Sequence, residues 1–183
     1  INPITSPIKD VFSSSAMSIT LPQPKHDKQG SMYSSTICML YRRAKEKEYE
    51  YMTRIVLLIG SYRPQSNGRR VMHLLSRLLQ DVGAHVDAFD AGTLDLPHLK
   101  ETYGQMATPP ETLIAMKGAL DACDGVVLIS GEYNHLPQPG LLNMLNFFYE
   151  EYRGKIAGLA TYSIGMYGGM RTEGALRTIT AAL

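Results

Sequence analysis

From residue 53 onward the sequence alternates between short apolar runs and amphipathic stretches, and this alternation restricts the chain to few folds. The run 54–59 is rich in Ile, Val and Leu throughout, as is typical of a strand buried on both faces. The next apolar residues recur at helical spacing with arginines between them: Val71, Leu74, Leu75, Leu78, Leu79 and Val82. Repeated units of this kind favour a parallel sheet with right-handed crossovers.

Three further units follow with the same pattern. Strands are predicted at 85–89, 125–130 and 156–162. Helices are predicted after Pro110 with Leu113, Met116 and Leu120 inward, over 141–152 with Leu142, Leu145 and Phe148 inward, and at the end with Leu176, Ile179 and Leu183. We therefore predict an α/β, flavodoxin-like, doubly wound parallel sheet in the order 2-1-3-4. The fifth edge strand of such a sheet is missing from the pattern, so we expect the domain 53–183 to be C-terminally incomplete.

Residues 1–52 have a different composition from the rest. They are rich in Ser, Pro, Lys and Gln, and the charged run 42–48 has no steady apolar period. Such a segment buries too little apolar surface to offset the entropy of ordering it, so we predict a disordered or irregular N-terminal extension. The low acidic content up to Met32 leaves a transit peptide as the alternative, although arginine is absent there.

Charge and cysteine content exclude several kinds of partner. The formal net charge is +1 at pH 7, so we expect no nucleic-acid partner and no strongly acidic docking face of the kind that electron carriers use. Cys38 and Cys123 are the only cysteines and have no metal-site spacing, which predicts no metal and a reduced, cytoplasmic setting. No apolar run approaches the about 20 residues of a membrane span, so we expect no membrane partner.

The segment 60–68 has the chemistry of a phosphate site. It combines a tight turn, the hydroxyls of Ser61 and Ser66, the guanidinium of Arg63 and the start of a helix. Backbone N–H groups at a helix start lack intrahelical partners, and the helix dipole attracts an anion. The alternative is a Gly- and Pro-rich surface turn with a solvated arginine, because short motifs of this kind recur by chance.

Two other loops follow predicted strands. In the first, the peptide bonds after Gly131 can approach a flat ring, and Tyr133 can pack beside it; an ordinary surface turn is the alternative. In the second, the loop 163–169 has three glycines, which suit close contact between backbone and ligand but also suit a flexible connection. Because ligands bind at the carboxyl ends of parallel strands, the three loops together predict one site.

Together these motifs resemble the NAD(P)H-dependent FMN reductases, a family that includes quinone, azo and chromate reductases. The first motif is Gly-Ser-Tyr-Arg-Pro-Gln-Ser at 60–66. The second is Gly-Glu-Tyr-Asn at 131–134, followed by Pro-Gly-Leu-Leu-Asn at 139–143, and the third is Gly-Met-Tyr-Gly-Gly-Met-Arg at 165–171. The resemblance places Ser61, Arg63 and Ser66 at the FMN phosphate, with Asn67 beside them offset by one position from a common family Asn. It places Gly131, Glu132, Tyr133 and Asn134 along the isoalloxazine, and Ser163, Gly165, Gly168 and Gly169 on its other polar edge.

The resemblance implies an FMN-dependent oxidoreductase that uses NADPH or NADH to reduce quinones or similar small acceptors by ping-pong hydride transfer. The chemistry is centred on the flavin, so no residue is assigned as catalytic. Family members are typically homodimers or homotetramers. The alternative function is a non-catalytic or weakly flavin-binding module that acts through protein–protein contacts. Gly131 stands where many members have Pro, which we expect to loosen its loop.

Overall fold

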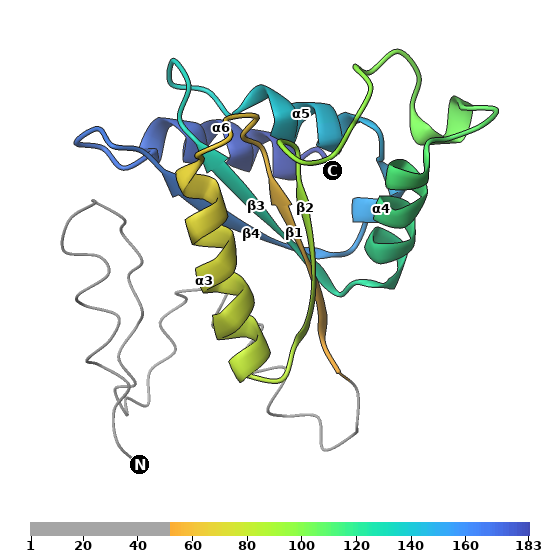
Figure 1. The fold of residues 1–183 in the computed structure, drawn as a ribbon, viewed down its shortest axis with the longest axis horizontal. Helices are drawn as coiled ribbons and strands as arrows, with labels where there is room; N and C mark the ends of the chain where they lie inside the picture. The colour runs from red at the N-terminus through yellow and green to blue at the C-terminus, as the bar shows by residue number, and fades with distance from the viewer. Residues whose placement is uncertain (1–51) are drawn as a thin grey trace.

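The computed structural model describes residues 52–183; the predicted extension up to residue 51, with Cys38, lies outside the described residues. Four parallel strands form one sheet in the order β2-β1-β3-β4, which confirms the predicted order (Figure 1). The strands are β1 Arg54–Ile59, β2 His85–Asp90, β3 Gly125–Gly131 and β4 Ile156–Tyr162. The second and third strands each run one residue further than predicted.

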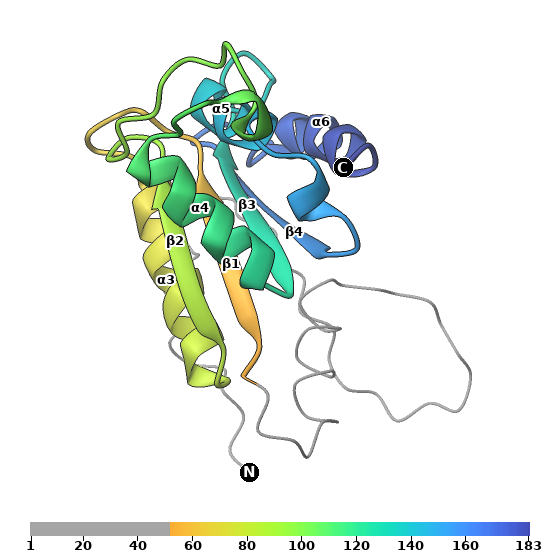
Figure 2. The ribbon, with the colours of Figure 1, turned by 90° about the vertical axis from the view of Figure 1, so that its right-hand side faces the viewer.

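Helices cover both faces of the sheet (Figure 2). They are α3 Asn67–Asp81, α4 Glu111–Ala122, α5 Pro139–Asn146 and α6 Met170–Thr180, with short 3-10 turns η1 Tyr103–Gln105 and η2 Glu150–Tyr152. Alternate residues of β1 face opposite ways: Leu57 packs towards α3, whereas Leu58 packs into a larger core with α4, α5 and α6. The predicted inward residues of α4 are fully buried: Leu113, Met116 and Leu120.

The helix predicted over 141–152 is too long. α5 ends at Asn146, and the chain continues through a turn into η2. Phe147 and Phe148 are both buried, and neighbouring residues of an α-helix point about 100° apart, so leaving the helix lets both rings enter the core. The buried apolar residues of α5 are Leu141, Met144 and Leu145. Leu142, predicted to point inward, is only partly buried.

The apolar stripe of α3 is less buried than its period predicts. Leu75 is buried, but Leu78 and Val82 are 39% and 44% exposed. In the part of the chain that the structure describes, α3 is the only helix in the core on its face of the sheet. The outer residues of its stripe therefore have no second helix to pack against. No helix within residues 52–183 combines the length and the apolar character that a membrane crossing requires.

The parallel arrangement puts every strand's carboxyl end at one edge of the sheet. The loops from β1 to α3, from β3 to α5 and from β4 to α6 leave the sheet at that edge (Figure 1). These are the three loops that the sequence motifs single out.

Candidate functional site

The loop between β1 and α3 brings several hydrogen-bond donors to one end of this edge. Ser66 caps α3, its Oγ accepting a hydrogen bond from the backbone N–H of Gly68 at 3.0 Å, and the buried Ser61 accepts one from Arg63 at 3.3 Å. Within residues 52–183, five backbone N–H groups of this loop have no acceptor: those of Ser61 and Tyr62, and the three consecutive ones of Gln65, Ser66 and Asn67. The first turn of α3 has no acidic residue. These donors therefore fit a phosphate dianion.

Arg63 connects this loop to the loop after β3. Its guanidinium carbon lies 4.8 Å from the centre of the Tyr133 ring, a cation–π contact. The hydroxyls of Ser61 and Tyr133 are 3.5 Å apart, at the outer limit of a hydrogen bond. Arg63 is otherwise exposed, so its charge is accessible to an anion from solvent.

Arg69 and Asp90 hold the same loop, and neither was predicted from sequence as a site residue. Arg69 Nε donates to Asp90 Oδ2 at 2.5 Å, and Arg69 Nη1 donates to the carbonyl oxygen of Pro64. The buried Asp90 ends β2, and its Oδ1 accepts a hydrogen bond from the backbone N–H of Gly92 at 2.9 Å. The pair thus ties the loop after β1 to the loop after β2. Helical periodicity places Arg69 only among the polar residues between the apolar positions of α3. It does not indicate the partner, because Asp90 lies 21 residues away in sequence.

Gly131 is the last residue of β3, where it pairs with Tyr162 of β4. It is buried, and a Cβ placed on it would lie 2.8 Å from Gln138 Nε2 and 3.0 Å from the Tyr162 ring. The buried Gln138 is itself fixed, because its backbone N–H donates to Ser130 Oγ at 3.0 Å. The loosening that we expected from this glycine is therefore wrong: the residue sits inside the sheet, where it leaves space for two packed side chains.

Tyr162 is a second contact that no sequence motif pointed to. Its hydroxyl lies 3.2 Å from Ser66 Oγ and donates to Gln138 Oε1 at 3.4 Å. As the last residue of β4, it links the phosphate loop to the segment before α5. A tyrosine at the end of an apolar run is indistinguishable in sequence from an ordinary strand residue.

The carboxylate of Glu132 turns towards the start of α6. Its Oε1 lies 3.1 Å from His135 Nδ1 and 4.0 Å from Arg171 Nη1, and the side chain is 11% exposed. The hydrogen bond with His135 lowers the pKa of Glu132 below its usual value against the opposing effect of desolvation, and the backbone N–H of Thr172 lowers it further. Glu132 is thus ionised at neutral pH and stabilises the start of a helix whose N-cap, Gly169, has no side chain to cap it.

The remaining predicted residues lie around the rim of the edge. Asn67 begins α3 and Asn134 has φ 50°, and both are exposed. In the loop after β4, Ser163 Oγ accepts a hydrogen bond from Gly165 at 3.1 Å, while Gly168 and Gly169 have φ 57° and 91°. All twelve predicted cofactor-binding residues therefore lie in three loops at one edge or in the strand or helix residue next to them: Ser61, Arg63, Ser66, Asn67, Gly131, Glu132, Tyr133, Asn134, Ser163, Gly165, Gly168 and Gly169. Their contacts with FMN stay predictions.

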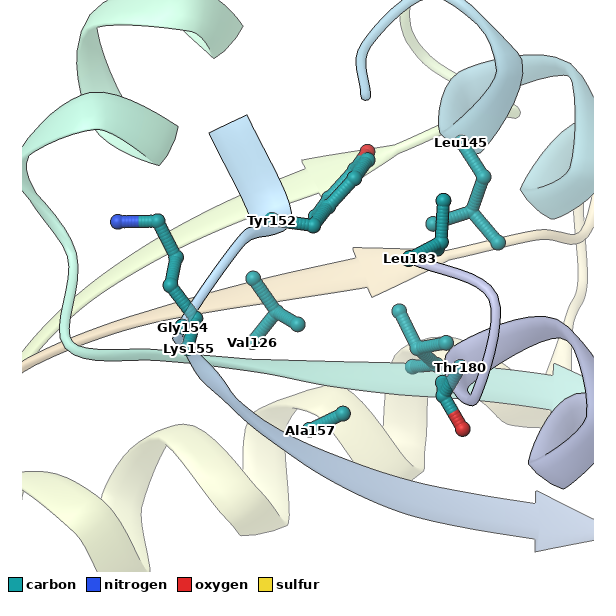
Figure 3. Close-up of a pocket in the computed structure, with 9 residues that line it drawn as sticks. Val126, Leu145, Tyr152, Gly154, Lys155, Ala157, Thr180 and Leu183 are labelled. Atoms are coloured by element: carbon teal, nitrogen blue, oxygen red, sulfur yellow. The ribbon is translucent and has the colours of Figure 1, made fainter. Parts of the chain in front are cut away.

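A cavity of about 240 Å³ beside β4 is a separate feature (Figure 3). Its lining includes Val126, Leu145, Tyr152, Lys155, Thr180 and Leu183, and none of the predicted cofactor-binding residues. The ammonium of Lys155 donates to the carbonyl oxygen of Cys123 at 2.7 Å, and burial raises the pKa of Tyr152 well above its usual value. This lining has a single cation and no cluster of donors, so the strand-end edge is the candidate site.

A family model described as NADPH-dependent FMN reductase matches residues 53–183. The chain belongs to the NADPH-dependent FMN reductase family. Membership confirms the predicted family and identifies the protein as an enzyme of the flavin oxidoreductase class, with FMN as cofactor and NAD(P)H as electron donor.

Individual relatives agree with this membership. The quinone reductases of Escherichia coli (strain K12) and Shigella flexneri are each 29% identical to this FMN reductase family member over 133 residues, which is 70% of this chain and 70% of theirs. FerB, a flavoenzyme NAD(P)H:(acceptor) oxidoreductase from Paracoccus denitrificans, has a TM-score of 0.62 at 24% identity over 71% of each chain. An NADH:FMN oxidoreductase, EMOB, in its apo form, has a TM-score of 0.60 at 17% identity over 72% of this chain and 69% of its own. The two solved structures show that the fold is shared.

Proposed function

We propose that this enzyme reduces quinones or similar small acceptors with electrons from NAD(P)H, and that donor and acceptor occupy one site in turn, in a ping-pong sequence. FMN held by these loops would supply the redox chemistry, namely hydride transfer from the nicotinamide and delivery of the electrons to the acceptor. The observation that carries the proposal is the meeting of the three loops at one strand-end edge, with unpaired donors on the first of them. Similarity to quinone reductases supports the class of acceptor.

Each loop has its own proposed part in holding FMN. The loop after β1 binds the phosphate through Ser61, Arg63, Ser66 and Asn67. The loop after β3 lies along the isoalloxazine through Gly131, Glu132, Tyr133 and Asn134. The loop after β4 meets the other polar edge through Ser163, Gly165, Gly168 and Gly169. The carboxylate of Glu132 stabilises this last loop indirectly, because it stabilises the start of α6, where the loop ends.

We further propose that the protein forms homodimers or homotetramers in the cytoplasm. Exposed apolar side chains gather around the loop after β4, with Ile164 96%, Met166 81% and Met170 62% exposed. Clustered apolar groups at a surface favour association, and a neighbouring subunit at this loop would also exclude water from the ring end of the site.

Steady-state kinetics of the purified protein test the reaction. We expect the purified protein to bind FMN with a shifted flavin absorbance spectrum and to oxidise NADPH only when a benzoquinone acceptor is present. Double-reciprocal plots at several acceptor concentrations should be parallel. Intersecting lines would contradict a ping-pong sequence. Binding of FMN with no NADPH oxidation would instead favour the non-catalytic binding module.

A further inference from the structure

We propose that the Arg69–Asp90 ion pair positions the phosphate loop by fixing the orientation of the peptide bond between Pro64 and Gln65. The inference rests on the proposed function, because the phosphate concerned is that of FMN. Arg69 and Asp90 are positioning residues in this role. The groups proposed to touch the phosphate belong to the loop itself and the start of α3, namely their backbone N–H groups and the side chains of Ser61, Arg63, Ser66 and Asn67.

The geometry of Arg69 joins three segments through one rigid group. Its Nε is fixed on the buried carboxylate of Asp90 at 2.5 Å, and its Nη1 donates to the carbonyl oxygen of Pro64. Its Nη2 lies close to Gly92, where an added Cβ would be 2.8 Å from that nitrogen and 2.7 Å from the carbonyl oxygen of Ser61. The guanidinium is planar with its donors in a fixed fork, so anchoring Nε also fixes the direction from which Nη1 meets Pro64.

The orientation of one carbonyl decides which way the loop's donors point. In a trans peptide the C=O and the N–H point in opposite directions, and no cis peptide bond occurs in residues 52–183. With the Pro64 oxygen held by Arg69, the N–H of Gln65 points away from the guanidinium. The next two N–H groups along the chain, those of Ser66 and Asn67, also have no acceptor in the described residues. The ion pair thus holds the Pro64 carbonyl dipole on its own side and leaves the N–H of Gln65 directed away from it, available to an anion together with the unpaired donors that follow.

Asp90 also keeps Arg69 from binding the phosphate directly. The Asp90 side chain is 8% exposed and the Arg69 side chain 25%, so the pair is largely shielded from solvent. A neutralised, anchored guanidinium is not available to bind the phosphate directly. That task is left to Arg63, which is exposed and has no carboxylate partner among the described residues. Removal of the Asp90 carboxylate is therefore expected to disturb the geometry of the loop after β1, even though it leaves the Arg69 guanidinium without its carboxylate partner.

Comparison of FMN with riboflavin tests the proposal, because riboflavin has the same ring and ribityl chain but no phosphate. Dissociation constants of both are measured by flavin fluorescence on the full chain and on its Asp90→Asn and Arg69→Met variants. We expect FMN to bind about tenfold more weakly to each variant and riboflavin affinity to stay within about twofold. Asp87→Asn is the matched control: Asp87 lies on the same strand and pairs with Arg54 at 3.5 Å, away from the site, so both affinities should be unchanged.

Three results would overturn the inference. Equal weakening of FMN and riboflavin would mean that the pair only stabilises the domain. Tighter FMN binding by Asp90→Asn would mean that Arg69 itself is a phosphate ligand which Asp90 restrains. Unchanged FMN affinity in both variants would mean that the loop keeps its geometry without the pair. If the unaltered protein binds neither flavin, the proposed function fails and the inference falls with it, whereas in the other three cases the proposed function stands.

Discussion

The loops after β1 and β4 are built in opposite ways. The first is held on several sides, by the Ser66 cap, by Tyr162 and by the Arg69–Asp90 pair. The second makes hydrogen bonds mainly within itself, and its Ile164 is 96% exposed. One end of the candidate flavin site is therefore arranged before any ligand arrives, while the other is anchored chiefly where it joins α6. Affinity for the phosphate and the fit of the ring therefore depend on different residues.

The largest expected effect tests how firmly the second loop is anchored at its end. Gly169 has φ 91°, and a Cβ there would lie 2.9 Å from the backbone nitrogen of Tyr162. We expect Gly169→Ala to lower the free energy of unfolding by about 2 to 4 kcal/mol, because both the conformation and the contact oppose a side chain. Urea denaturation of the variant and of the unaltered protein measures this difference in the free energy of unfolding.

Gly165→Ala is the control for that substitution in the same loop. Gly165 is exposed, and a Cβ there would make only an ordinary contact at 3.4 Å with Ser163 Oγ. Its effect should stay within about 0.5 kcal/mol. Equal destabilisation by the two substitutions would show that the whole loop, and not only its end, is rigid.

The next effect isolates the phosphate end. Arg63→Ala should weaken FMN binding about ten- to a hundredfold, or about 1.5 to 3 kcal/mol, because a charge-assisted contact is lost. Riboflavin affinity should not change. Arg70→Ala is the control, since Arg70 is an exposed residue of α3 near the same loop. Fluorescence titration at one fixed salt concentration measures the dissociation constants of FMN and riboflavin for the unaltered protein and both variants. Unchanged FMN affinity in Arg63→Ala would remove Arg63 from the site.

A smaller effect concerns the ring end. Glu132→Gln should weaken FMN and riboflavin alike, by about two- to fivefold, because α6 loses a carboxylate at its start and the loop before it shifts. The opposite pattern, with FMN alone affected, would assign Glu132 to the phosphate end.

The pH dependence of the same variant gives a second readout. The folded pKa of Glu132 lies below its ordinary value of 4.5, so its contribution to stability is present above that value and is lost as the pH falls through the folded pKa. The stability difference between the unaltered protein and Glu132→Gln should therefore be full at neutral pH and should shrink in acid below pH 4.5. Denaturation curves at several pH values check it, and a difference that grows in acid would contradict it.

The smallest effect concerns the exposed tip of the loop after β4. Ile164→Ser should change the free energy of unfolding by no more than about 0.5 kcal/mol, because a side chain that is 96% exposed buries almost nothing within its own subunit. Its effect on subunit association, measured by light scattering, should be larger than its effect on monomer stability. A large loss of monomer stability would show that the tip packs against the domain.

The sheet could be predicted from sequence because its signal is local. A continuous apolar run such as 54–59 identifies a buried strand without any partner, and the alternation of strands and helices indicates a parallel, doubly wound sheet. The order 2-1-3-4 followed from taking that sheet as flavodoxin-like. The end of α5 could not be predicted in this way. The pattern of leucines continues past Asn146, and only the core decides that Phe147 and Phe148 both turn inward.

The candidate site was predictable in part for a similar reason. Motifs at strand ends identify loops, so Ser61 and Ser66 were found where the chain turns. Arg69, Asp90 and Tyr162 were not found, because each acts through a partner far away in sequence. Periodicity shows which face of an element a residue occupies, but not which distant group it meets there.

The N–H groups of Gln65, Ser66 and Asn67, which have no acceptor within residues 52–183, also affect how fast the cofactor is captured. A loop whose donors are already aligned does not rearrange when a phosphate arrives, so association is limited by diffusion and by attraction to Arg63. That attraction is screened over about 10 Å at 0.1 M ionic strength. Added salt therefore slows capture of FMN, while the time that the cofactor stays bound is set mainly by the loops around its ring.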